Sequence, residues 1–72
     1  MAGGNKVYRK TEIVGTSDTS IEDAVTHALK RAQQTLRNVQ WFEITEQRGR
    51  LNNGKIEFQV SLQVGFELEE ST

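Results

Sequence analysis

Residues 56–68 alternate strictly between apolar and polar side chains, with a glycine once in a polar position. Because successive side chains of a strand point to opposite faces, this period of two predicts one long strand with a single buried face. Such a face needs an apolar partner, so another part of the chain has to supply it. The apolar set is Ile56, Phe58, Val60, Leu62, Val64, Phe66 and Leu68.

Residues 21–36 supply that partner, because their apolar residues recur every three or four positions. This period predicts an amphipathic helix whose apolar stripe packs on the strand. Ser20 is expected to cap its first turn, with the Asp23 side chain returning a hydrogen bond as in a capping box. The stripe consists of Ile21, Ala24, Val25, Ala28, Leu29, Ala32 and Leu36.

Two further segments complete the predicted sheet. "KVYRKTEIVG", residues 6–15, is rich in strand-forming residues, and residues 41–48 alternate with period two. "GRLNNG", residues 49–54, predicts a turn centred on its Asn-Gly pair, which makes the last two strands an antiparallel hairpin. The expected fold is α+β: a three-stranded antiparallel sheet wrapped around one helix, in the order β-α-β-β. It forms a single domain over residues 1–72, with a core of about 6–69.

Length and composition exclude several classes of protein. At 72 residues the chain buries little of its own surface, and with no cysteine it forms neither disulfides nor thiolate metal sites. Self-association is therefore the expected source of stability. A formal net charge of −1 argues against nucleic-acid binding, and no apolar run is long enough to span a membrane. The segment "MAGGNKVYRK" has no apolar signal-peptide core, so we expect a cytoplasmic protein.

Trp41 is the one tryptophan of the chain, and the alternation predicts that it points away from the helix. Phe42 and Ile44 are the expected core residues of its strand. An indole left in water forfeits about 4–6 kcal/mol, taking ~150–250 Å² at about 25 cal/mol/Å². Three interpretations are open: a side chain folded over the sheet edge, an anchor at a subunit interface, or a stacking surface for a planar ligand. The predicted outer face consists of Trp41, Glu43, Thr45, Gln47 and, from the last strand, Gln59.

Three stretches of sequence carry a resemblance to a known family. "KVYRKTEIVGTSDTSIEDAV" opens the domain, "TLRNVQWFEITEQRG" lies in its middle and "IEFQVSLQVGFELEE" closes it. From Lys6 to Glu70 the chain resembles the dodecins, small flavin-binding proteins that assemble as hollow shells of twelve subunits. The resemblance implies a homododecamer with pairs of flavins at two-fold axes, stacked between symmetry-related tryptophans.

The resemblance also implies which residues bind the flavin, whether FMN, riboflavin or FAD. Trp41 matches the stacking tryptophan, Gln59 a glutamine that hydrogen-bonds the polar edge of the isoalloxazine, and Arg48 an arginine that contacts the flavin. The glutamine amide both donates and accepts, which suits that edge, and an arginine fork suits the phosphate of FMN. Strict alternation puts Arg48 on the face opposite to Trp41 unless the strand bulges, so a solvated charge is its other interpretation. Some dodecins carry a basic residue where this chain has Glu67, which puts phosphate binding at that position in doubt.

The other polar residues are interpreted without a ligand. His27 lies off the apolar stripe and is expected to be a solvated or interface residue. Glu43, Glu57 and Glu67 would meet only across an assembly axis, so no metal site is predicted. Thr45 and Gln47 are expected to line the ligand pocket or, preferably, the subunit contact.

No catalytic arrangement is recognisable, because the chain has no second histidine, no nucleophile paired with a base and no glycine-rich phosphate loop. The predicted function is flavin storage or sequestration, with quenching of flavin photochemistry by electron transfer from Trp41. A structural oligomer with Trp41 as interface anchor and no flavin is the alternative, and a flavoenzyme is a third class. A flavin binder purifies yellow, whereas a structural oligomer purifies colourless.

Overall fold

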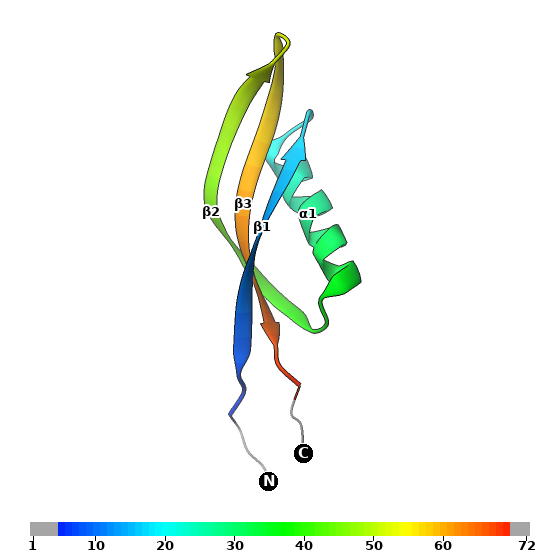
Figure 1. Cartoon of the computed structure of the whole chain (residues 1–72), viewed down its shortest axis with the longest axis vertical. Coiled ribbons are helices and arrows are strands. Elements are labelled where there is room, and N and C mark those ends of the chain that lie inside the picture. Colours follow the sequence, from blue (N-terminus) through cyan, green and yellow to red (C-terminus); the bar gives the residue numbers. More distant parts are fainter. Residues whose placement is uncertain (1–4, 70–72) are drawn as a thin grey trace.

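The computed structural model describes residues 5–69, which form one helix and three strands in the predicted order (Figure 1). The elements are β1 (Tyr8–Ser17), α1 (Ile21–Thr35), β2 (Val39–Asn52) and β3 (Lys55–Glu67). Both strand pairs are antiparallel and β3 lies in the middle, in the order β1-β3-β2. The predicted fold is confirmed, and no helix within residues 5–69 is long and apolar enough to cross a membrane.

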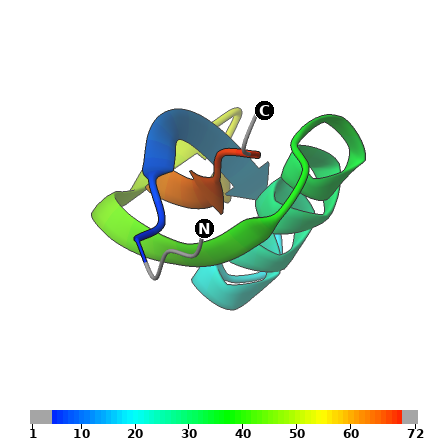
Figure 2. The ribbon, with the colours of Figure 1, turned by 90° about the horizontal axis from the view of Figure 1, so that it is seen from below.

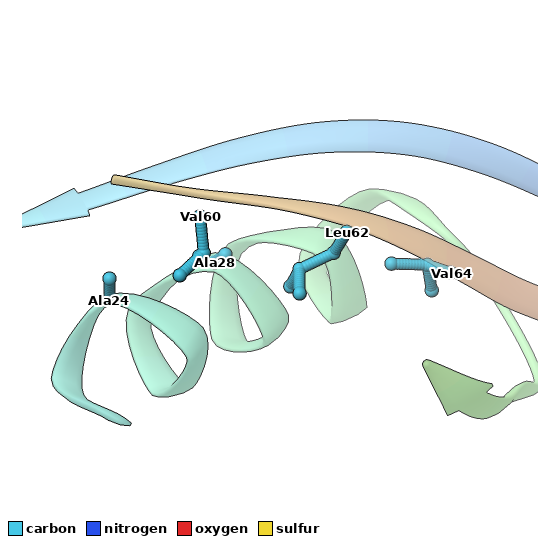
Figure 3. Packing of buried hydrophobic residues seen from close by; sticks show 5 residues of the cluster. All are labelled: Ala24, Ala28, Val60, Leu62 and Val64. Atoms are coloured by element: carbon cyan, nitrogen blue, oxygen red, sulfur yellow. The ribbon is translucent and has the colours of Figure 1, made fainter. Parts of the chain in front are cut away.

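The core lies between α1 and the central strand. Val60, Leu62 and Val64 are fully buried on the side of β3 that faces the helix, as the alternation predicts. Figure 3 shows them on the side of β3 that faces α1, in one cluster with Ala24 and Ala28. The small alanine side chains let the helix approach the sheet closely, which gives a thin core of few large side chains.

Gly15 of β1 marks the closest approach of helix and sheet. A Cβ at this position would lie 2.7 Å from the carbonyl oxygen of Ala24 and 2.8 Å from the Cβ of Ala28. Both atoms belong to α1, so neither can move aside unless the helix shifts. The packing of α1 therefore depends on a glycine in the neighbouring strand.

The first turn of α1 is capped as predicted, but only by half of the capping box. The Ser20 hydroxyl accepts the backbone N–H of Asp23 at 2.9 Å. The predicted return bond from Asp23 to Ser20 is wrong, because the Asp23 carboxylate accepts from the buried Ser17 hydroxyl at 2.6 Å. The Ser17 oxygen in turn accepts the Ser20 N–H at 3.3 Å, so Ser17 takes the place of the missing bond.

The hairpin between β2 and β3 is longer than the sequence suggested. The predicted turn over residues 49–54 is wrong in extent, because β2 continues to Asn52 and pairs there with Lys55. Only Asn53 and Gly54 form the turn, with φ of 54° and 78°, as a two-residue type I′ turn requires. The tip of this hairpin reaches beyond the helix in Figure 1.

β2 is the exposed strand of the sheet. Phe42 and Ile44 pair with Val64 and Leu62, so they lie on the helix-facing side as predicted. Their burial in a core is nevertheless wrong, because each is 44% exposed. The helix packs against β1 and β3, and the curled sheet carries β2 away from it (Figure 2). The chain is 58 Å long but only 14 Å in its thinnest dimension, so it leaves much apolar surface for another molecule to cover.

Candidate functional site

The side of the sheet that points away from α1, termed the outer face, carries Trp41. Trp41 pairs with Gly65 of β3, and Gly65 pairs on its other side with Lys10 of β1. A register shift between Val39 and Trp41 puts these two residues on opposite faces. The predicted outward direction of Trp41 is therefore confirmed, and the indole is 39% exposed.

Gly65 gives the indole its position. A Cβ built on Gly65 would overlap three atoms of the benzene half of the indole, Cε2, Cζ2 and Cη2. The ring therefore occupies the space in which a side chain of the central strand would stand. Trp41 does not fold over the edge of the sheet, as one of the three interpretations held, but lies across its middle.

Two side chains of β1 lie on this part of the outer face. The ring of Tyr8 stands edge-on to Trp41, with centroids 5.0 Å apart and planes inclined at 68°. Lys10 Nζ lies 3.7 Å from Glu43 Oε1, and this ion pair also bridges the central strand. Tyr8 thus contacts the indole directly, and an exposed ion pair crosses the same outer face nearby in the strand register.

Arg48 lies on the same outer face, because β2 contains an extra residue. Ile44 pairs with Leu62 and Glu46 with Ser61, so Thr45 is the unmatched residue of a β-bulge. The Thr45 hydroxyl donates to the Ser61 carbonyl at 3.2 Å.

The bulge reverses the facing of every residue after it. Arg48 pairs directly with Gln59 on the outer face. The strand does bulge before Arg48, so the position opposite to Trp41 that strict alternation gives for Arg48 is wrong. Arg48 also donates to Glu46 at 2.6 Å. Gln47 pairs with the buried Val60, which makes its predicted place beside Trp41 wrong.

Trp41 and the Arg48–Gln59 pair are far apart within one chain. Gln59 and Gly65 are six residues apart on β3, which at about 3.3 Å per residue puts them about 20 Å apart. This exceeds the length of a flavin ring system. A single chain therefore carries two separate parts of the predicted site, and the structure does not bring Trp41 and Gln59 together.

The remaining candidates lie apart from this face or form no cluster. His27 is exposed on α1, with Nδ1 at 3.6 Å from Asp23. Glu57 is held by Arg50 on the outer face at 2.7 Å. Within residues 5–69, no three histidine or carboxylate side chains lie close enough together to hold a metal ion.

The sequence interpretation missed Tyr8, Lys10 and Gly65 as neighbours of Trp41. A signal for Gly65 existed, because it interrupts an otherwise polar series on the outer face of residues 56–68. A glycine in a strand interior often marks the close approach of another group. Tyr8 and Lys10 had no such signal, because their contacts depend on the pairing of β1 with β3.

Comparison with known proteins gives consistent matches. The family model described as Dodecin matches residues 7–69, which span α1 and all three strands. The dodecin of Thermus thermophilus is 51% identical over 67 residues, covering 92% of this chain and 97% of the relative. A calcium dodecin of Mycobacterium tuberculosis is 33% identical over 63 residues, covering 86% and 89%. The solved structure of dodecin from Streptomyces davaonensis has a TM-score of 0.87 at 48% identity, and covers 93% of this chain and 100% of that one.

Proposed function

The chain belongs to the dodecin family, and we propose that it stores and sequesters flavin by stacking the isoalloxazine on Trp41. Dodecins are small binding and storage proteins rather than enzymes, and they self-associate. The observation that carries the proposal is the position of Trp41: a partly exposed indole lies across Gly65 on the outer face of the sheet.

The chemistry of an indole suits a flavin. The isoalloxazine is flat and electron-poor, whereas the indole is the most electron-rich flat side chain. Stacking of a heteroaromatic ring on an aromatic side chain contributes about 1–3 kcal/mol in nucleic-acid complexes. In the same geometry the excited flavin takes an electron from Trp41 and returns it, which quenches flavin fluorescence and photochemistry.

The polar edge of the flavin is recognised by a second chain. Gln59 and Arg48 lie about 20 Å from Trp41 on the same sheet, since six residues of β3 at about 3.3 Å each separate the two rows. A flavin on Trp41 of one subunit therefore meets Gln59 and Arg48 only if a neighbour supplies them. Gln59 pairs with the isoalloxazine edge, and Arg48 contacts the ring or, in FMN, the phosphate.

The exposed apolar surface of the chain supports an assembly in which this is possible. Phe42, Ile44, Leu51 and Ile56 are all at least 44% exposed. The first three lie on β2, which α1 leaves uncovered, and Ile56 lies near the hairpin end of β3. A second chain that covers them offsets the small core of the first. We propose that the assembly is a homododecamer with flavins at its two-fold axes. We also propose that it is cytoplasmic, as expected from the sequence.

A titration of FMN with flavin-free protein tests the proposal, with the particle mass followed by light scattering. Saturable quenching near one flavin per subunit, on a particle of about twelve chains, is the expected result. An unquenched titration on the same large particle would favour a structural oligomer without flavin. Turnover of a reductant by the bound flavin would instead favour a flavoenzyme.

Variants at Trp41 separate stacking from quenching. Trp41→Ala should weaken FMN binding by about 5- to 150-fold, the equivalent of 1–3 kcal/mol of stacking. Trp41→Phe keeps a ring that is much harder to oxidise, so bound FMN should become brighter while much of the affinity is retained. Loss of the assembly in both variants would indicate that Trp41 is an interface anchor.

Variants at Arg48 and Gln59 test the contribution of the second chain. Gln59→Ala should weaken FMN and riboflavin alike, and Arg48→Ala should weaken FMN more than riboflavin if the guanidinium binds phosphate. Arg50→Ala is the matched control, because Arg50 lies two residues along the same face and is paired with Glu57. Equal losses at Arg48 and Arg50 would indicate a general effect of charge.

A further inference from the structure

Tyr8 and Trp41 meet although a whole strand lies between them. Tyr8 belongs to β1 and Trp41 to β2, and β3 separates the two strands. Neighbouring strands lie about 4.8 Å apart, so the backbones of β1 and β2 are about 10 Å apart. The rings nevertheless approach to 5.0 Å between centroids. They do so above Gly65, the position of the central strand that carries no side chain.

The angle between the two rings is the one that aromatic pairs favour. At 68° the edge of one ring faces the other, so positive edge hydrogens meet a negative ring face. Tyr8 is 40% exposed and gains no burial in the core from this position. Its contact with the indole therefore does more to fix the orientation of Trp41 than to fill the interior.

A fixed indole matters for a ligand that binds by stacking. A mobile side chain has to be ordered when the ligand arrives, and that loss of freedom subtracts from affinity. Gly65 leaves space for the indole on the face of β3, but this space alone leaves the ring free to slide and tilt. Tyr8 limits its movement towards the Glu67 end of β3, since Tyr8 pairs with Glu67, two residues beyond the Gly65 that pairs with Trp41.

We infer that Tyr8 is a positioning residue of the Trp41 site. Its ring edge holds the plane of the indole across Gly65, so that a planar aromatic ligand meets a stacking surface that is already set. The inference rests on the proposed function in one respect, namely that this ligand is a flavin. It assigns Tyr8 no contact with the ligand itself.

Three variants test this role. Tyr8→Leu removes the ring but keeps an apolar side chain, whereas Tyr8→Phe keeps the ring edge and removes only the hydroxyl. Val14→Ala is the control, because Val14 lies on the same face of β1 and pairs with Ser61, away from Trp41. Far-UV circular dichroism and particle mass confirm folding, and Tyr8→Val replaces Tyr8→Leu if the latter does not assemble.

The first measurement uses the protein without ligand. Trp41 is the one tryptophan, so the indole bands in near-UV circular dichroism and the indole fluorescence anisotropy report on it alone. Tyr8→Leu should weaken the indole bands and lower the anisotropy, while Tyr8→Phe and Val14→Ala should leave both unchanged. Unchanged indole signals in Tyr8→Leu would overturn the inference.

The second measurement uses FMN as the probe. Tyr8→Leu should lower FMN affinity by about 5- to 10-fold and lengthen the fluorescence lifetime of bound flavin, and Tyr8→Phe should stay within twofold of the parent. Equal losses in Tyr8→Leu and Tyr8→Phe would show that the hydroxyl touches the ligand, and would overturn a purely positioning role. A parent protein that does not bind FMN, but whose indole bands respond to Tyr8→Leu alone, would refute the flavin and keep the positioning role.

Discussion

The indole of Trp41 occupies the space above Gly65 that a side chain of the central strand would otherwise fill. Because of this relationship, the side chain of Trp41, which belongs to the edge strand β2, lies over the central strand β3 in the middle of the sheet. It also explains how Tyr8, two strands away, can reach the indole. The candidate site thus depends on a residue that contributes no functional group.

Gly65→Ala should therefore displace Trp41. The added methyl group overlaps the benzene half of the indole, so the ring has to leave the face of β3 while the strand itself accepts alanine. We expect a loss of near-UV indole signal and a fall in FMN affinity as large as that of Trp41→Ala. Gly49→Ala is the matched control, because its Cβ would meet only Glu57 and Ile56 atoms at 3.9–4.0 Å. A Gly65→Ala protein with the parent's indole spectrum would contradict the prediction.

Gly15→Ala should destabilise the fold without a direct effect on the outer face. The new Cβ would lie 2.7 Å from the Ala24 carbonyl oxygen, so α1 has to shift away from the sheet. Overpacking of this kind costs about 1–3 kcal/mol. The thermal midpoint, measured at fixed protein concentration, should fall relative to Gly49→Ala. About 1 kcal/mol shifts the thermal midpoint of a small domain by several degrees. A midpoint within about one degree of that control would therefore show that the helix moves freely.

Ser20→Ala should remove the cap of α1. The Ser20 hydroxyl accepts the Asp23 N–H at 2.9 Å, and loss of such a cap costs about 0.5–2 kcal/mol. Thr26→Ala is a suitable comparison, because the Thr26 hydroxyl bonds only to the Glu22 carbonyl on an exposed part of the helix. Denaturation by urea should show the loss for Ser20→Ala and little change for Thr26→Ala. Equal midpoints would mean that Ser17 caps the helix by itself.

Ile44→Asp should break the assembly while each chain keeps its fold. Ile44 lies on the helix-facing side of the sheet but is 44% exposed in a single chain, so we expect another subunit to bury it. A carboxylate buried there without a partner carries a desolvation cost of several kcal/mol. Light scattering should report smaller particles for Ile44→Asp and full-size particles for Gln34→Asp, which adds the same charge to the exposed face of α1. Full-size Ile44→Asp particles would place the subunit contact elsewhere.

The sequence by itself determined the elements of this protein and the facing of its central strand. The uninterrupted alternation of residues 56–68 predicted which side of β3 is buried, and the period of residues 21–36 predicted the helix that covers it. Both signals are local, because a side chain's direction follows from its own backbone. The outward direction of Trp41 followed from the same rule.

Tertiary structure decided the positions at which this local rule does not predict the facing or burial of a side chain. One unmatched residue, Thr45, moved Arg48 onto the face of Trp41 and Gln47 away from it, and nothing in the local pattern marks a bulge. The close approach of α1 at Gly15 fixed the helix over β1 and β3, which left Phe42 and Ile44 exposed although their pattern is that of core residues. Pairing of β1 with β3 brought Tyr8 to Trp41 across Gly65. These features depend on contacts between residues far apart in the chain, so only the packed sheet could decide them.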